Sequence, residues 1–313
     1  MPNKQYLTID PDRTGQRIDN FLIAYFKLPK PLIYRWLRKG ELRVNNIRTV
    51  PAYKLQAGEI LRIPPFTTLK EKRIIPVSKK HLQYLKSSII YEDNNYIVLN
   101  KPSGIAVHGG SGINSGLIER LRLLRPDEKK LELVHRLDKE TSGCLIFAKK
   151  YNVLVYFHKL FKNQQIKKSY HAFVHGRWPK KITTINLPLK KYVLSQGERI
   201  VRVSHSSGKD ARTTIQILKY FKNYTLLKVL PSTGRTHQIR VHLAAYNHPI
   251  ICDKKYGSIE QNDEFYKAGF KRLFLHANSL EFKDPITNER VNIKSSYDSA
   301  CKKLLSKLHT IKY

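Results

Sequence analysis

The chain has 313 residues, which is enough for one large domain with a substantial core and a small second domain. Its 58 Lys and Arg residues against 24 Asp and Glu give a formal charge of +34, which implies a polyanionic partner. The N-terminus lacks the apolar core of a signal peptide, no apolar run is long enough to span a bilayer, and three cysteines suggest no disulfide framework. The basic residues are spread through folded-looking segments, which favours nucleic acid over a membrane surface. We therefore expect a cytoplasmic, monomeric protein with RNA or DNA as its partner and no membrane partner.

The first predicted unit is a small basic module, residues 14–64. Apolar residues three and four apart predict a helix from Gln16 to Leu28, and Pro31 and Gly40 bound a second helix. Short strands at 42–44 and 60–63 follow. Ten Lys and Arg minus three acidic residues leave a charge of +7 in this module, which suits a protein that binds RNA by shape and charge. The candidate RNA-binding residues are Arg17, Lys30, Arg35, Arg38, Lys39 and Arg43.

This module resembles the αL RNA-binding domain of ribosomal small-subunit protein four. The matching strings are R-I-D-x-F at 17–21 and R-K-G-x-x-x-V-N at 38–45. The alternative is a helical cap whose basic residues only face the solvent. Residues 65–86, a basic and poorly periodic stretch with Pro65 and Pro76, predict a linker, and residues 87–313 then form the larger domain.

The larger domain is expected to begin with a hairpin whose strands cover 88–91 and 96–99. The glycine-rich stretch Val107–Gly112 is followed by no Gly-Lys-Ser/Thr string and lacks the glycine spacing of a dinucleotide fingerprint. It therefore indicates a flexible loop, and no nucleotide cofactor is expected. A helix with Leu117, Leu121 and Leu124 on one face follows.

The nonapeptide His135–Gly143 lies between two apolar, strand-like flanks, and its Thr-Ser-Gly end supplies turn residues. Asp138 is therefore expected at a corner between strand and turn. Its neighbours include Arg136 and Lys139, and a carboxylate close to cations stays ionised. Such a group suits a nucleophile or a base. The alternative is that Asp138 only hydrogen-bonds the backbone of the turn.

The segment Lys168–Gly176 predicts a strand that carries Tyr170 on one face. The strand alone favours a Tyr170 that packs in the core with its hydroxyl hydrogen-bonded. His171 and His175 are four residues apart without a third ligand, so no metal site is predicted.

A second polar motif, Pro231–His242, follows a predicted strand at 225–230. Gly234 indicates a turn from strand to helix, and Thr236 is expected to cap the helix. Arg235 should then lie at the start of the helix, where a guanidinium can hold a carboxylate or a phosphate through two hydrogen bonds.

Four strings together resemble the RluA family of pseudouridine synthases. They are N-K-P-S-G at 100–104, H-R-L-D-x-x-T-S-G at 135–143, K-x-Y-x-A-x-V-x-G at 168–176 and T-G-R-T-H-Q-I-R at 233–240. The resemblance implies an α+β fold with a mixed, mainly antiparallel sheet and flanking helices. It implies that Asp138 is catalytic, that Arg235 pairs with it and that Tyr170 lies against the target base. Arg136 and His135 are implied to help extrude that base.

The resemblance also implies the reaction, which is the isomerisation of specific uridines to pseudouridine in the 23S RNA of the large ribosomal subunit, without a cofactor. Two alternatives remain: the same chemistry on another RNA such as a transfer RNA, or an RNA-binding ribosome-assembly factor without catalysis. The presence of Asp138, Tyr170 and Arg235 together argues against the second, because a binding protein has no need of all three. One departure from the family is Cys252, where relatives commonly have a small residue such as Gly.

Overall fold

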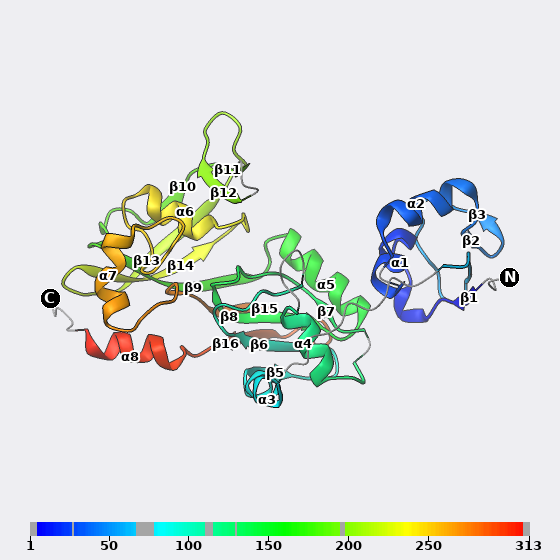
Figure 1. Cartoon of the computed structure of the whole chain (residues 1–313), viewed down its shortest axis with the longest axis horizontal. Coiled ribbons are helices and arrows are strands. Elements are labelled where there is room, and N and C mark those ends of the chain that lie inside the picture. The colour runs from blue at the N-terminus through cyan, green and yellow to red at the C-terminus, as the bar shows by residue number, and fades with distance from the viewer. Residues whose placement is uncertain are drawn as a thin grey trace. The chain divides into compact units, whose positions relative to one another are not determined.

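The structure is a computed structural model that describes residues 5–26, 28–66, 78–109, 115–128, 130–194 and 198–308. The chain divides into two compact units, whose main segments run to residue 76 and from residue 77 onward. Figure 1 traces the elements of each unit. Residues 67–77 of the predicted linker and residues 110–112 of the predicted glycine-rich loop lie outside the described residues.

The first unit packs two helices and a four-stranded sheet around one apolar core. The helices are those predicted: α1 (Ile18–Phe26) and α2 (Lys30–Lys39), which ends where Gly40 adopts a φ of 68°. The strands are β1 (Gln5–Thr8), β2 (Arg43–Val44), β3 (Ile47–Arg48) and β4 (Ile60–Ile63). They pair in the order β1-β4-β2-β3, so β1, which precedes the predicted boundary at residue 14, belongs to the same sheet.

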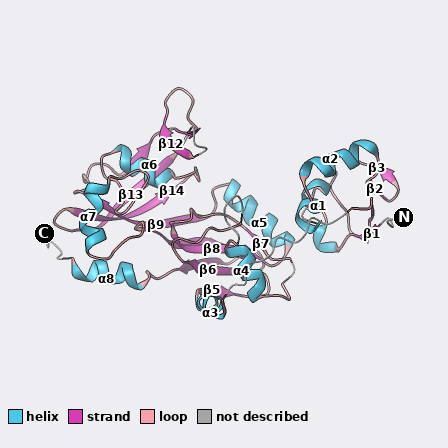
Figure 2. Cartoon of the chain, in the orientation of Figure 1, coloured by secondary structure: helices cyan, strands magenta, loops and turns pink. Residues whose placement is uncertain are grey.

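The second unit is built on one mixed sheet, which Figure 2 shows flanked by helices. Its described strands are β5 (Ile89–Glu92), β6 (Tyr96–Lys101), β7 (Glu132–Leu133), β8 (Ser142–Ala148), β9 (Lys167–His175), β10 (Thr184–Asn186), β13 (Arg212–Tyr220), β14 (Tyr224–Pro231), β15 (Leu275–Lys283) and β16 (Arg290–Lys294). The main order is β10-β13-β14-β9-β15-β8-β6-β5, while β7 pairs with β8 and β16 with β15. Only the described β8 and β15 pair in parallel, which confirms the predicted α+β fold with a mixed, mainly antiparallel sheet.

Both faces of the sheet are covered, which explains the continuous apolar runs of its central strands. Alternate residues of β6 belong to two different cores, with Tyr96 and Val98 in one and Ile97 and Leu99 in the other. The helices of this unit are α3 (Lys79–Ser87), α4 (Leu117–Leu124), α5 (Tyr151–Lys162), α6 (Gln238–Ala245), α7 (Ile259–Lys267) and α8 (Ser299–Lys307). α5 packs on the first of these cores and α4 on the second. No helix within the described ranges has the length and apolar character needed to cross a membrane.

Residues 177–210, for which the sequence predicts no specific structure, contain β10 and a two-stranded hairpin of β11 (Leu189–Val193) and β12 (Arg199–Val203). Figure 1 shows this hairpin projecting from the main sheet. Lys255 and Tyr256, in the segment before α7, hold β12 near α6. The amide of Val201 donates to the hydroxyl of Tyr256 (3.1 Å), and Lys255 Nζ donates to the carbonyl of Arg199 (2.7 Å).

The corner that carries Asp138 differs from the prediction in one respect. The turn lies at Lys139 and Glu140, whereas Ser142 and Gly143 already belong to β8. The reason is the parallel pairing of Gly143 with Ala277 of β15. A side chain at Gly143 would place its Cβ 2.2 Å from the carbonyl oxygen of Ala277, and the φ of Gly143 is +111°. Glycine is therefore required by the close approach of two strands.

We expect Gly143→Ala to destabilise the second unit by about 3 kcal/mol or more, because backbone atoms of β15 must move to admit the methyl group. The measurement is urea-induced unfolding. Gly269→Ala is the matched control, since Gly269 has a φ of +83° but open space at its Cβ position. This control isolates the conformational cost of about 1 kcal/mol. Equal effects of the two substitutions would contradict the steric argument.

A charged network joins β5, α4 and β8 at one edge of the sheet. Glu92 receives Arg125 Nη2 at 2.6 Å and Lys149 Nζ at 2.9 Å, and Lys149 also reaches Glu128 at 3.0 Å. The hydrogen bond from Arg125, supported by Lys149, lowers the pKa of Glu92 to about 2. A carboxyl group whose pKa is lowered on folding stabilises the protein above its unfolded pKa, and this contribution is lost as the pH falls toward the folded pKa.

We therefore expect the wild-type protein to lose about 2 kcal/mol of stability from Glu92 between about pH 4.5 and pH 2, and Glu92→Gln to lack this part of the acid dependence. Unfolding free energies measured in urea from pH 7 to pH 2.5 test this. Glu289→Gln, which removes an exposed carboxylate, is the control. A constant difference between wild type and Glu92→Gln across this range would contradict the prediction.

Candidate active site

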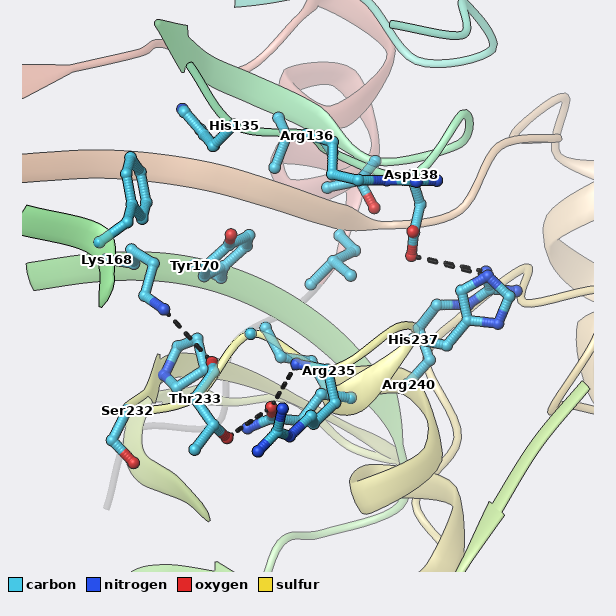
Figure 3. Close-up of a pocket in the computed structure, with 18 of the residues that line it drawn as sticks. His135, Arg136, Asp138, Lys168, Tyr170, Ser232, Thr233, Arg235, His237 and Arg240 are labelled. Carbon is cyan, nitrogen blue, oxygen red and sulfur yellow. Dashed lines mark hydrogen bonds and ion pairs between the residues drawn. The ribbon is translucent and has the colours of Figure 1, made fainter. Parts of the chain in front are cut away.

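Asp138 lies in the corner between β7 and β8, as the sequence predicts. Leu137 is buried beneath it, and the backbone amide of Thr141 donates to the carbonyl of Asp138 (3.1 Å). The side chain of Asp138 is 23% exposed, and its carboxylate borders a cavity. Within the described structure, the carboxylate does not hydrogen-bond the backbone of the turn. Figure 3 shows it pointing into the cavity toward His237.

Two cationic or potentially cationic groups lie within 4 Å of this carboxylate. Nε2 of His237 is 3.9 Å from Oδ2 of Asp138, and Nη1 of Arg240 is 4.0 Å from the same oxygen. Both residues come from the start of α6. The guanidinium of Arg240 is positively charged, whereas His237 carries a charge only when it is protonated.

Arg240 is held in place by a buried carboxylate. Its Nε and Nη2 donate to the two oxygens of Asp253 at 2.7 and 2.6 Å, and Asp253 is fully buried as a side chain. The guanidinium also lies over the ring of Tyr256, 5.0 Å from its centroid. This two-point contact with Asp253 leaves Nη1 free to face Asp138. Cys252, next to Asp253, has a φ of 58° in the left-handed region, which explains why a small residue such as Gly suits this position.

His237 has an unusual backbone conformation, with a φ of 52°. This turns its ring toward Asp138 and lets Nδ1 share a hydrogen bond of 2.7 Å with the hydroxyl of Tyr256. Burial lowers the pKa of His237, while the charge of Asp138 acts in the opposite direction. A non-glycine residue in this conformation is strained, and such strain is typical of functional sites.

The predicted pairing of Arg235 with Asp138 is corrected by the structure. Nε of Arg235 donates to the carbonyl of Asp210 (3.1 Å), and the guanidinium beside Asp138 belongs to Arg240. The reason is the local turn: Gln238 accepts the amide of Arg235 (3.0 Å) and the hydroxyl of Thr233 (2.7 Å). The predicted cap at Thr236 is also wrong, because α6 follows His237 and has no side-chain cap.

Tyr170 lies on β9 and borders the same cavity as Asp138 (Figure 3). Its side chain is half-buried, and burial, with a contribution from Asp138, raises the pKa of its hydroxyl. Tyr170 is therefore a neutral aromatic ring at neutral pH. Nearby, Nζ of Lys168 donates to the carbonyl of Thr233 (3.2 Å), which links β9 to the turn before α6.

His135 and Arg136 have different environments although they are adjacent. The ring of His135 accepts the amide of Ile146 at 3.2 Å and packs on Phe161, and burial lowers the pKa of His135 to about 3. His135 is thus a neutral residue that supports β8. Arg136 is exposed at the edge of the cavity and makes no ion pair or hydrogen bond with the described part of the chain.

The cavity has a volume of about 530 Å³. This lies within the range of sites that enclose a small organic ligand. A second cavity of about 440 Å³ also borders Asp138, Arg136, His237 and Arg240. Lys101, buried beside the corner, donates from Nζ to the carbonyls of Pro102, Ile105 and Lys139, and so fixes the turn that follows Asp138. The residues around the first cavity include Asp138, Thr141, Phe161, Lys168, Tyr170, Ser232, Thr233, Arg235, His237 and Arg240.

The candidate RNA-binding residues of the first unit fall into three groups. Arg17 is exposed but forms a bidentate ion pair with Asp19, at 3.1 and 2.7 Å. Arg43 is half-buried and donates to backbone carbonyls of Gly40 and Asn46. The others are exposed on α2: Lys30, Arg35, Arg38 and Lys39.

Known proteins are similar to this chain over most of its length. Residues 95–245 match the family described as RNA pseudouridylate synthase. Ribosomal large subunit pseudouridine synthase C of Pasteurella multocida is 49% identical, over 96% of this chain and 93% of its own. The protein of the same name from Escherichia coli is 45% identical, over 98% and 97%.

A solved structure shows the same fold. Human RNA Pseudouridylate Synthase Domain Containing 1 superposes with a TM-score of 0.60 at 25% identity, and covers 76% of this chain and 93% of its own. The sequence matches extend over nearly the whole chain, and the strings that carry the predicted resemblance lie within them. The chain therefore belongs to the RNA pseudouridylate synthase family.

Proposed function

We propose that this protein converts specific uridines of large-subunit (23S) ribosomal RNA to pseudouridine, with Asp138 as the catalytic carboxylate. The names of its relatives support the substrate class. The observation that carries the proposal is one carboxylate that faces a cavity, flanked by His237 and Arg240, with the ring of Tyr170 at the same cavity.

The reaction breaks the bond between ribose and a uracil nitrogen, rotates the base and rejoins it through a ring carbon. No electrons are gained or lost overall, so the reaction needs a group that manages charge at the sugar. An ionised carboxylate can act as a nucleophile at the sugar, as an electrostatic partner of a positively charged sugar or as a base at the neighbouring ribose carbon. All three routes use Asp138 in its charged form.

The neighbours of Asp138 have distinct tasks in this proposal. Arg240 and His237 hold the negative charge and direct the carboxylate into the cavity. Tyr170 offers a neutral aromatic face on which an extruded uracil can stack. Arg235, which lines the same cavity without pairing with Asp138, is assigned to contacts with the RNA, and so is the exposed Arg136.

The division of labour along the chain is also a proposal. Residues 14–64 would bind RNA through the exposed cations of α2, and the second unit would perform the chemistry. The linker, predicted over residues 65–86, would reach only to α3, which belongs to the second unit. We further propose that the protein acts in the cytoplasm as a monomer. Cys144, Cys252 and Cys301 are buried and unpaired, which fits a reducing compartment.

The test is a map of pseudouridines in ribosomal RNA from cells with and without the protein. Carbodiimide modifies each pseudouridine, and reverse transcriptase then stops at the modified base. We expect discrete stops in large-subunit RNA to vanish without the protein and to return when the wild-type chain is supplied. The proposed substrate would be contradicted if stops vanished only from transfer RNA, or if no stop vanished from any RNA.

A further inference from the structure

Four residues on four different strands of the first unit form one row across its sheet. Tyr6 of β1 pairs with Arg62 of β4, Arg62 pairs with Arg43 of β2, and Arg43 pairs with Arg48 of β3. Paired residues of neighbouring strands point to the same face. On β1, β2 and β4 the apolar residues that alternate with this row belong to the core or pack against it: Leu7, Val44, Leu61 and Ile63. The row therefore lies on the opposite, outer face of the sheet.

The three guanidinium groups of this arginine row (Arg43, Arg48 and Arg62) gather at the C-terminal end of α2. Nε of Arg43 and Nη2 of Arg62 donate to the carbonyl of Gly40, at 3.0 and 3.3 Å. A Cβ at Gly40 would lie 2.5 Å from Nε of Arg48, so the third guanidinium lies against this glycine. The absence of a side chain at Gly40 therefore allows three positive groups to meet at one place.

No carboxylate neutralises this cluster among the described residues. In the described part of the first unit, ion pairs join Arg17 to Asp19 and Lys39 to Glu41, and neither involves the arginine row. Like charges on directly opposite strand residues are destabilising. The carbonyl of Gly40, at a helix end with partial negative charge, offsets only part of this repulsion. An arrangement that costs stability and has no counter-charge of its own suits an anionic ligand.

We infer that the arginine row and Tyr6 form a binding site for a strand of RNA, with phosphate groups at the guanidiniums and a base on the tyrosine ring. Guanidinium groups bind phosphate oxygens through paired hydrogen bonds. Tyr6 is 63% exposed at the end of the row, where its ring can stack on an unpaired base. An acidic protein segment would use the charges but not the ring. This inference rests on the proposed function, because it takes RNA to be the substrate.

The site adds to the binding residues that the sequence indicates. Arg43 is one of the predicted binding residues, but its side chain donates hydrogen bonds to backbone carbonyls. It forms a charged surface only together with the neighbouring arginines. Arg48 and Arg62 are brought to it by strand pairing over short and long separations. Tyr6 precedes the predicted module and joins the row only through β1.

Two substitutions in the full chain test the site. Arg48→Gln removes a guanidinium that makes no hydrogen bond to the described structure, so the fold should be unaffected. The Kd of Arg48→Gln for a fragment of 23S RNA transcribed in vitro should rise about three- to tenfold at low salt. The slope of log Kd against log salt should fall by about 0.7 to 1. Tyr6→Ala should raise Kd about fivefold or more and leave this slope unchanged, because stacking does not release counterions.

Lys54→Gln is the matched control, since it removes one exposed positive charge from the same unit at a residue outside the four strands that carry the row. At saturating RNA, the single-turnover rate of pseudouridine formation by Lys54→Gln should equal the wild-type rate. The inference is overturned if Arg48→Gln resembles Lys54→Gln in affinity and slope, or if Tyr6→Ala binds like the wild type. Failure of the proposed function would be seen separately, as a wild-type protein that forms no pseudouridine in this RNA.

Discussion

Asp138→Asn is expected to lower the single-turnover rate of pseudouridine formation by about 10⁴-fold or more. The variant should bind RNA about as tightly as the wild-type protein does. The amide keeps the shape of the side chain but cannot act as a nucleophile or a base. It is also uncharged, so the electrostatic interaction with Arg240 and His237 is lost. The backbone bond from Thr141 to the carbonyl of residue 138 is untouched, so the corner should keep its conformation.

Affinity and chemistry must be measured separately for this variant, by filter binding and by single-turnover assays on the same RNA. Removing a negative charge from a site that meets phosphate groups should leave Kd unchanged or slightly lower. Asp263→Asn, which removes an exposed carboxylate on α7, controls for the change in net charge. Substantial turnover by Asp138→Asn would show that another group performs the chemistry.

Much of the fold follows from local sequence patterns. The helices α1 and α2 were predicted from the spacing of apolar residues and from Pro31 and Gly40, because both signals act within a few residues. The strands on either side of Asp138 were likewise evident from apolar runs. The sequence did not indicate β1, since its four residues are too few for a periodic signal and they pair only with β4, more than fifty residues later in the chain.

The site was predicted in part. Asp138 and Tyr170 border one cavity as the resemblance implied, although they are far apart in the chain. The choice between Arg235 and Arg240 could not be made from spacing, because both lie at the same turn and helix. It depends on the left-handed backbone of His237 and on the buried carboxylate of Asp253, which only tertiary structure brings into contact with Arg240.

Arg240→Gln should therefore impair both stability and chemistry. It leaves the fully buried carboxylate of Asp253 without its partner, which is expected to destabilise the second unit by about 3 kcal/mol. It also removes the guanidinium beside Asp138, and we expect turnover to fall about 100-fold or more even under conditions where the variant is folded. Urea-induced unfolding and single-turnover kinetics at saturating RNA measure the two effects.

The double variant Arg240→Gln with Asp253→Asn separates these effects. An asparagine can still accept the amides of Lys255 and Tyr256 through its oxygen, and it leaves no uncompensated charge in the interior. Stability should largely return, whereas turnover should stay low because no guanidinium faces Asp138. Arg235→Gln is the informative comparison: it should weaken RNA binding more than the rate at saturating RNA, since Arg235 lines the cavity without reaching the carboxylate. A double variant with restored turnover, or an Arg235→Gln variant as slow as Arg240→Gln, would assign the supporting charge to a residue other than Arg240.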